Sequence, residues 1–218
     1  MARAPDVGFC APEGIKLGTG SQFLLYREVN CEGKYAVIRP PDEETAHEML
    51  VAKFRWREGH ADIWKFFVDG SDFSLLINGL AEPWRDAGIT HVLGIESRGF
   101  LLGGAVAVSL NAGFQAVRKE GGLLPGPKLF ARSELDYRSK SYELRMQDVL
   151  SPGDVVLLVD DWAELGSQAT AARTLVESSG ARFAGASLIV DQLEDEMRMK
   201  IGRVTSLAFA TELGNPDA

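Results

Sequence analysis

The sequence contains little cysteine, no long apolar run and no excess of positive charge. Its only two cysteines, Cys10 and Cys31, are too few for a disulfide scaffold, so we expect two reduced thiols, with a disulfide between them as the alternative. No apolar run approaches the ~20 residues that a membrane helix needs. No charged-then-apolar leader is found at the N-terminus, and the cytoplasm is therefore the expected compartment.

The charge balance is acidic. A formal net charge of -8 argues against generic nucleic-acid binding, because such binding needs a cationic surface to displace counterions. A phosphate site remains compatible with this charge, since backbone amides and a few local Arg and Lys residues suffice to hold an anion. The sequence has no Gly-rich phosphate loop ending in Lys-Ser or Lys-Thr, which argues against a nucleotide-binding protein of that kind.

The rest of the composition is that of an ordinary globular protein, with 45% hydrophobic and 25% charged residues in a chain of 218. This length suits one α/β domain with an added arm or hood. We divide the chain into an N-terminal extension, residues 1–60, and a core domain, residues 61–218. In the extension, apolar segments at 23–26 and 35–38 around a Gly-bearing turn predict a β-hairpin, and 43–55 has the spacing of an amphipathic helix.

The core domain alternates between predicted strands and helices. A helix is expected to begin at Ser71, as its capping residue, and to end at Pro83. Segment 155–159 is apolar without alternation, which indicates burial on both faces, as in a parallel sheet. Further strands are predicted at 91–95, 114–117, 183–190 and 204–210, and further helices at 100–110 and 168–179. This order predicts an α/β fold, an open parallel sheet flanked by helices.

Segment 155–168 carries the chemistry. Asp160 and Asp161 follow the buried strand, and a short loop with Gly166 leads into a helix. Ligands of open α/β sheets bind at the carboxyl ends of strands, and a helix N-terminus offers unpaired N–H groups to a phosphate. The layout suits a ribose 5-phosphate, with amides for the phosphate and acids for the ribose diol or a bound Mg²⁺.

This segment resembles the phosphoribosyl pyrophosphate signature of type I phosphoribosyltransferases, in which an apolar strand precedes two acids and a loop rich in Thr and Gly. Asp160 and Asp161 match the acid pair, and Gly166 matches the first loop glycine. The resemblance implies the fold of that family, with a hood or hairpin extension at the N-terminus.

Four loop positions depart from the usual signature. Leu165 and Gln168 stand where Thr is usual, and Ser167 stands where Gly is common. These changes remove hydroxyl contacts, of which Ser167 restores one, and they bear on affinity rather than on the fold. Glu164 occupies the place where the hypoxanthine-guanine branch has an aspartate beside the base. By that analogy Glu164 is a general base or a hydrogen-bond partner of the incoming nucleophile; a solvent-facing loop acid is the alternative.

Upstream, segment 94–100 closely resembles the pyrophosphate loop of the adenine phosphoribosyltransferases, the branch to which the chain is most similar. The resemblance implies that Arg98 clamps a diphosphate bidentately, with a surface arginine as the alternative. Lys119, after the next strand, is implied to reach the pyrophosphate, in some relatives from the neighbouring subunit.

Segment 123–137 resembles the flexible catalytic loop of the same branch. Asp136 and Tyr137 stand in place of the family's Glu-Tyr pair. A closing loop excludes water and protects an oxocarbenium-like ribose from hydrolysis. An exposed hairpin is the alternative.

The segment that would bind the acceptor base matches the family less well. Segment 62–64 resembles the start of an Asp-Ile-Thr-Pro run, but His60 and Ala61 stand where the family has a base-stacking Phe and an Arg. We predict that His60, Trp64 and Trp162 bind the base, and a structural role is the alternative for His60. Ala61 cannot supply the arginine contact, so the expected acceptor is a purine-like base rather than adenine specifically.

The resemblance covers the chain from about Ala61 onward. It implies transfer of phosphoribose from phosphoribosyl pyrophosphate to a purine-like base, with release of pyrophosphate, Mg²⁺ on Asp160 and Asp161, and a homodimer. The alternative is a non-catalytic regulatory protein that binds a phosphoribosylated ligand. A receiver-like protein is disfavoured, because receivers place their acid pair near the chain start. The predicted donor contacts are Glu96, Ser97, Arg98, Lys119, Asp160, Asp161, Ala163, Glu164, Leu165, Gly166, Ser167 and Gln168.

Overall fold

The computed structural model describes residues 27–29, 35–37, 41–133 and 141–214. The chain forms two compact units, Met1–Ile38 and Arg39–Ala218. In the first unit, β1 (Arg27–Val29) pairs antiparallel with β2 (Tyr35–Val37). The second strand lies where the predicted hairpin has it, and β1 follows directly after the segment 23–26 that was predicted as the first strand. Both cysteines and residues 23–26 lie outside the described residues.

The larger unit begins well before residue 61. Its first helix, α1 (Pro41–Lys53), packs against α2 (Gly70–Ala81) and against strand β11 (Val204–Phe209). Lys53 donates to both carboxylate oxygens of Asp72, at 2.6 and 2.7 Å, and so joins the two helices. Since α1 packs on α2 and β11, it is part of the same unit as the sheet. The functional division at residue 60 stays a prediction.

A seven-stranded sheet forms the centre of the described part of this unit, in the order β11-β10-β9-β5-β6-β8-β7. Strands β11 to β6 in this order run parallel, and β8 and β7 are antiparallel to their neighbours. The predicted open, mostly parallel sheet is confirmed; the antiparallel edge was not predicted. The strands not yet given are β5 (His91–Ile95), β6 (Gly113–Lys119), β7 (Lys128–Arg132), β8 (Glu143–Gln147), β9 (Val155–Ala163) and β10 (Arg182–Asp191).

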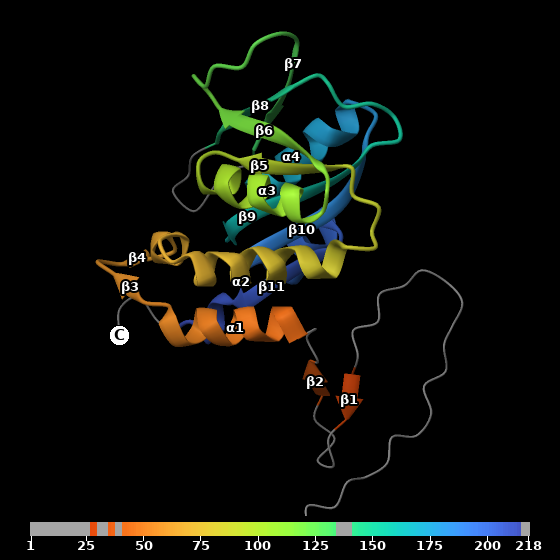
Figure 1. The fold of residues 1–218 in the computed structure, drawn as a ribbon. Coiled ribbons are helices and arrows are strands. Elements are labelled where there is room, and N and C mark those ends of the chain that lie inside the picture. The colour runs from red at the N-terminus through yellow and green to blue at the C-terminus, as the bar shows by residue number, and fades with distance from the viewer. Residues whose placement is uncertain (1–26, 30–34, 38–40, 134–140, 215–218) are drawn as a thin grey trace, which may run out of the picture. The chain divides into compact units, whose positions relative to one another are not determined.

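Helices cover both faces of the sheet (Figure 1). One face packs on α1, α2 and α3 (Arg98–Ser109), and the other packs on α4 (Ser167–Ser178) and α5 (Asp195–Ile201). In β9, Leu157 and Val159 belong to the first core, and Val156 and Leu158 belong to the second. The predicted burial of this strand on both faces is confirmed. Within the described residues, no helix is long and apolar enough to span a membrane.

Short elements complete the described fold. Asp69, not Ser71, caps α2: its carboxylate accepts from the N–H groups of Ser71 and Asp72, at 2.9 and 3.0 Å. The prediction of a Ser71 cap is wrong because the cap and the helix start lie two residues earlier, at Asp69 and Gly70. The remaining pieces are β3 (Trp56–Arg57), β4 (His60–Ala61), η1 (Trp64–Phe67), η2 (Glu82–Trp84) and η3 (Ala210–Glu212).

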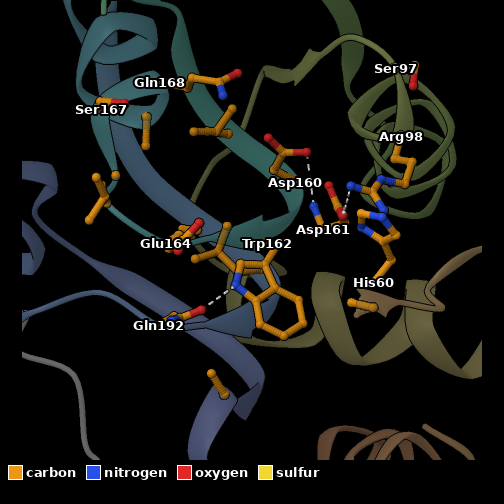
Figure 2. Close-up of a pocket in the computed structure, with 18 of the residues that line it drawn as sticks. His60, Ser97, Arg98, Asp160, Asp161, Trp162, Glu164, Ser167, Gln168 and Gln192 are labelled. Atoms are coloured by element: carbon orange, nitrogen blue, oxygen red, sulfur yellow. Dashed lines mark hydrogen bonds and ion pairs between the residues drawn. The ribbon is translucent and has the colours of Figure 1, made fainter. Parts of the chain in front are cut away.

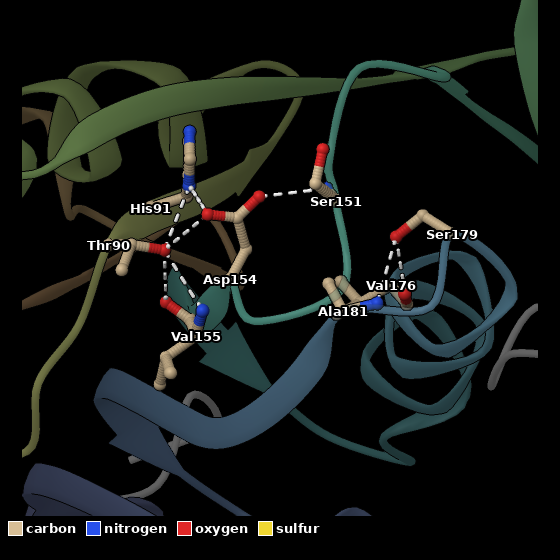
Figure 3. A network of polar contacts seen from close by, with 8 residues as sticks. All are labelled: Thr90, His91, Ser151, Asp154, Val155, Val176, Ser179 and Ala181. Atoms are coloured by element: carbon tan, nitrogen blue, oxygen red, sulfur yellow. Dashed lines mark hydrogen bonds and ion pairs between the residues drawn. The ribbon is translucent and has the colours of Figure 1, made fainter.

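A polar network fixes the amino-terminal edge of the sheet, where β5 and β9 begin (Figure 3). Thr90 Oγ1 donates to Asp154 Oδ1 at 3.1 Å and accepts from the N–H of Val155 at 2.9 Å. Asp154 also accepts from the N–H of Ser151, which lowers the pKa of its carboxyl, and its other oxygen lies 3.4 Å from His91 Nδ1. The network sets the register of β5 against β9, and so the relative position of their carboxyl ends.

The connections that follow β5 and β9 leave the sheet on opposite faces. α3 carries the chain from β5 to β6 on one face, and α4 carries it from β9 to β10 on the other. Because β5 and β9 are neighbours, their carboxyl ends border a crevice between the two connections. Open α/β sheets bind their ligands at such a switch point.

Candidate active site

Two glycines allow the turn after β5 to lie against the end of β9. A Cβ atom on Gly94 would overlap the carbonyl group of Gly99, and one on Gly99 would lie 3.1 Å from Asp160 Oδ1. The Glu96–Ser97 peptide bond in this turn is cis. The turn therefore brings Ser97 and Arg98, at the start of α3, next to the β9 carboxylates.

Glu96 ties the end of β5 to the end of β6. Its carboxylate accepts from the N–H of Lys119 at 2.6 Å and from Arg118 Nε at 2.9 Å. The Lys119 ammonium lies over the ring of Tyr142, 4.8 Å from its centre. Glu96 thus positions the backbone of Lys119.

The two aspartates lie within β9, which continues to Ala163 because it stays paired with β10 as far as Asp191. Asp161 is 6% exposed, and its Oδ2 lies 2.9 Å from Arg98 Nη2. Its N–H donates to Asp160 Oδ1 at 3.0 Å (Figure 2). The predicted partners Arg98, Asp160 and Asp161 therefore meet at one point.

The carboxyl of Asp160 has a raised pKa. Burial raises the pKa of its carboxyl well above the usual value, and the negative charge of Asp161 raises it further, with only partial relief from Arg98. The position therefore favours a ligand that brings positive charge or hydroxyl donors to the carboxylate.

The loop after β9 closes on the start of α4. Gly166 has a φ of 67°, in the left-handed region that favours glycine, and a Cβ there would overlap Met197 and Leu193. Ser167 is buried, and Thr170 Oγ1 donates to its carbonyl at 3.0 Å. The first N–H groups of a helix have no partner inside it, so this end offers a cradle for an anion.

One cavity of about 920 Å³ brings these groups together. The predicted donor contacts all line it: Glu96 to Arg98, Lys119, Asp160, Asp161, and the whole stretch from Ala163 to Gln168. Glu164 lies on this wall, as the analogy with the hypoxanthine-guanine branch requires. Asp136 and Tyr137 lie outside the described residues.

Aromatic rings line another part of the cavity. Trp162 packs edge-on against Trp56, with ring centres 5.7 Å apart, and near Phe54 at 6.3 Å. His60 lines the cavity with Trp162, as predicted. Trp64 is not among the described residues that line it, because η1 leaves the indole half exposed and packed edge-on against Phe67.

Comparisons with known proteins bear on this geometry. A search against models of protein families finds no match. The chain is similar to the adenine phosphoribosyltransferase of Dinoroseobacter shibae, 37% identical over 152 residues that span 66% of this chain and 84% of the relative. It is similar to the solved adenine phosphoribosyltransferase of Rhodothermus marinus, with a TM-score of 0.68 and 32% identity over 76% of this chain and 98% of that one. The chain belongs to the adenine phosphoribosyltransferase family.

A further solved relative was captured with ligands. The Saccharomyces cerevisiae adenine phosphoribosyltransferase, in complex with adenine and an imino-altritol bisphosphate, has a TM-score of 0.66 and 29% identity over 75% of this chain and 98% of its own. Family membership accounts for the position of the cavity at the switch point. As a member of this family, the chain is a purine phosphoribosyltransferase.

Several lining residues escaped the sequence reasoning. Trp56, Tyr142, Gln192, Thr211 and Gly214 also border the cavity. Gln192 had a usable signal, since it directly follows the carboxyl end of a strand beside β9. The others offered no motif, because tertiary packing alone brings them to the site.

Proposed function

We propose that this chain transfers phosphoribose from phosphoribosyl pyrophosphate to adenine and releases pyrophosphate. The observation that carries the proposal is the meeting, in one cavity, of Arg98, the β9 carboxylates and the start of α4. These supply a cation for the leaving group, acids for the ribose and amides for the 5-phosphate. The activity after which the family is named supports adenine as the acceptor.

Each residue of the site has a separate role in the proposed reaction. The amides at the start of α4 hold the 5-phosphate, and Asp160 and Asp161 accept from the ribose hydroxyls. The base nitrogen attacks C1′ as the bond from C1′ to the pyrophosphate oxygen breaks, and the leaving group takes the electron pair. Arg98 and Lys119 stabilise the charge that develops on that oxygen. Glu164 takes the proton lost from the base.

Mg²⁺ fits this donor set. In the described residues, no group of three His, Cys, Asp or Glu side chains gathers as a metal site. Mg²⁺ does not need one, because it commonly binds through one or two carboxylates, water and substrate phosphates. Asp160 and Asp161 supply those carboxylates. When bound, the ion neutralises charge on the pyrophosphate. A homodimer in the cytoplasm remains the expected state.

A regulatory protein that binds without turnover is the second candidate. Leu165 favours it, because an apolar, 44% exposed side chain stands in the phosphate loop where the family has a hydroxyl. The two candidates share donor binding and differ only in turnover.

Calorimetry with phosphoribosyl pyrophosphate and Mg²⁺, followed by an assay of pyrophosphate release with adenine, tests the proposal. We expect wild-type binding and turnover. Arg98→Ala should weaken donor binding about 10- to 100-fold, the loss typical of a charge-assisted contact of about 1.5–3 kcal/mol. Arg85→Ala, at a surface arginine paired with Glu82 and remote from the cavity lining, should leave affinity unchanged.

Two results would count against this proposal in different ways. Donor binding without pyrophosphate release from adenine would favour the regulatory protein. No donor binding by the wild type would contradict both candidates.

A further inference from the structure

The lining of the cavity is most highly charged where the donor is proposed to bind. Glu96, Arg98, Lys119 and the two β9 aspartates line that part. The lining near Trp162 is mostly uncharged and is formed by Trp56, Ala163, Gln192, Ala210 and Thr211, with the acid Glu164 following Ala163. A heteroaromatic base is planar and uncharged, so this second part suits the acceptor. Figure 2 shows Trp162 and Gln192 turned toward each other there, apart from Ser167 and Gln168.

The backbone of Gln192 is fixed at the end of β10. Its N–H donates to the carbonyl of Ala163 at 2.9 Å, which continues the pairing of Asp191 with Ala163. Asp191 is 1% exposed, accepts from the N–H of Leu193 at 2.8 Å and forms an ion pair with Arg198. The side chain of Gln192 therefore starts from a rigid point.

The hydrogen bond between Gln192 and Trp162 sets the orientation of the amide. Trp162 Nε1 donates to Gln192 Oε1 at 2.8 Å. An indole N–H can only donate, so the group facing it must be the amide oxygen. The two N–H donors on Gln192 Nε2 are consequently directed away from the indole.

Trp162 is also held on its other side. Trp56 packs edge-on against it, and Trp56 Nε1 is itself 3.2 Å from the carbonyl oxygens of Leu213 and of Gly214. The Trp162 indole is thereby fixed between Gln192 and Trp56. Its position in the cavity wall is built from three separate segments of the chain.

We propose that Gln192 determines the acceptor specificity of the site, an inference that rests on the proposed function. Its Oε1 holds the Trp162 indole as a planar wall, and its Nε2 donates to a ring nitrogen of the base that carries a lone pair. Adenine presents such a lone pair at every unsubstituted ring nitrogen of its six-membered ring. The nitrogen that discriminates is N1: adenine carries a lone pair there, whereas a 6-oxopurine carries an N–H at N1 and would oppose the amide donor with another donor.

Two substitutions separate the two roles of Gln192. Gln192→Glu keeps an oxygen for the Trp162 N–H but removes the donors, whereas Gln192→Leu removes both. We expect either change to raise the KM for adenine about tenfold, the equivalent of one hydrogen bond, with donor affinity within about twofold of wild type. Gln192→Glu should also raise the ratio of kcat/KM for hypoxanthine to that for adenine, because a carboxylate accepts from the ring N–H.

Tryptophan fluorescence provides a readout that does not depend on turnover. Gln192→Leu frees the indole N–H and should shift the emission, and Gln192→Glu should shift it less. Introducing Trp162→Phe into both variants and into the wild type should abolish these differences.

The possible outcomes distinguish this inference from the proposed function. If wild-type protein releases no pyrophosphate with adenine, the proposed function fails and this inference falls with it. If the wild type is active and both Gln192 variants keep its KM and its base preference, only this inference is wrong. An equal loss of donor and adenine affinity would also overturn it, because Gln192 would then support the fold rather than the acceptor.

Discussion

At the scale of single residues, Asp160 combines a functional position with a cost in stability. Its raised pKa arises first from burial and then from the charge of Asp161. Between the unfolded pKa of about 3.9 and the higher folded pKa, the native state binds more protons than the unfolded state. The free energy of unfolding therefore falls as the pH rises through this window.

Replacing Asp160 by Asn should stabilise the protein while it impairs function. We expect Asp160→Asn to raise Tm at pH 7.5 by roughly 2–4 °C, the shift for about 1 kcal/mol in a chain of this size, and to weaken donor binding. The gain in Tm should shrink as the pH falls toward 4, because the unfolded carboxyl, with its pKa of about 3.9, then also becomes protonated. Scanning calorimetry at both pH values measures it, with the exposed Asp148→Asn as the control. A lower Tm than wild type at pH 7.5 would contradict the argument.

The residues that could be predicted are those that share a contiguous motif. Arg98, Asp160 and Asp161 were found because each lies at the end of a strand in a recognisable segment. Trp56 was not, because its contact with Trp162 joins parts of the chain that sequence patterns do not connect. Gln192 follows the end of a strand, but it belongs to no recognisable motif.

At the scale of elements, the approach of the β5–α3 turn to β9 depends on Gly94. We expect Gly94→Ala to cost about 1–3 kcal/mol, the usual range for overpacking, because its Cβ meets backbone of Gly99 that cannot rotate away. Gly104→Ala in α3 is the matched control, since its Cβ meets nothing within 4 Å and an alanine favours the helix by about 0.5–1 kcal/mol. Chemical denaturation measures both. Equal stability of the two variants would show that the turn can relax.

The sequence predicts well those elements that have a clear apolar pattern. It did not predict the antiparallel strands β7 and β8. The apolar run of β9 and the helices α3 and α4 have clear patterns, and the structure confirms them. Helix α1 is confirmed as well, although its sequence is only weakly amphipathic. β8 alternates polar residues with the fully buried Leu144 and Met146, a strand signal that we missed, and β7 lies within the segment that we interpreted as the catalytic loop.

At the scale of the whole molecule, the described lining of the cavity lies entirely in the unit Arg39–Ala218. A protein lacking residues 1–38 should therefore bind phosphoribosyl pyrophosphate within about twofold of wild type. A deletion through residue 60 should unfold, because it removes the buried side chains of Ala46, Leu50 and Phe54 from the core. Circular dichroism and calorimetry on both proteins distinguish the two boundaries.

The shorter deletion also tests the predicted hood. If residues before 39 cover the base, their loss should raise the KM for adenine severalfold and leave the donor affinity unchanged, because only the acceptor loses contacts and protection from water. Initial rates at saturating donor measure this, and sedimentation of the same protein shows whether the deletion also changes the oligomeric state. An unchanged KM with an altered oligomeric state would assign the segment to a subunit contact, and the hood prediction would be wrong.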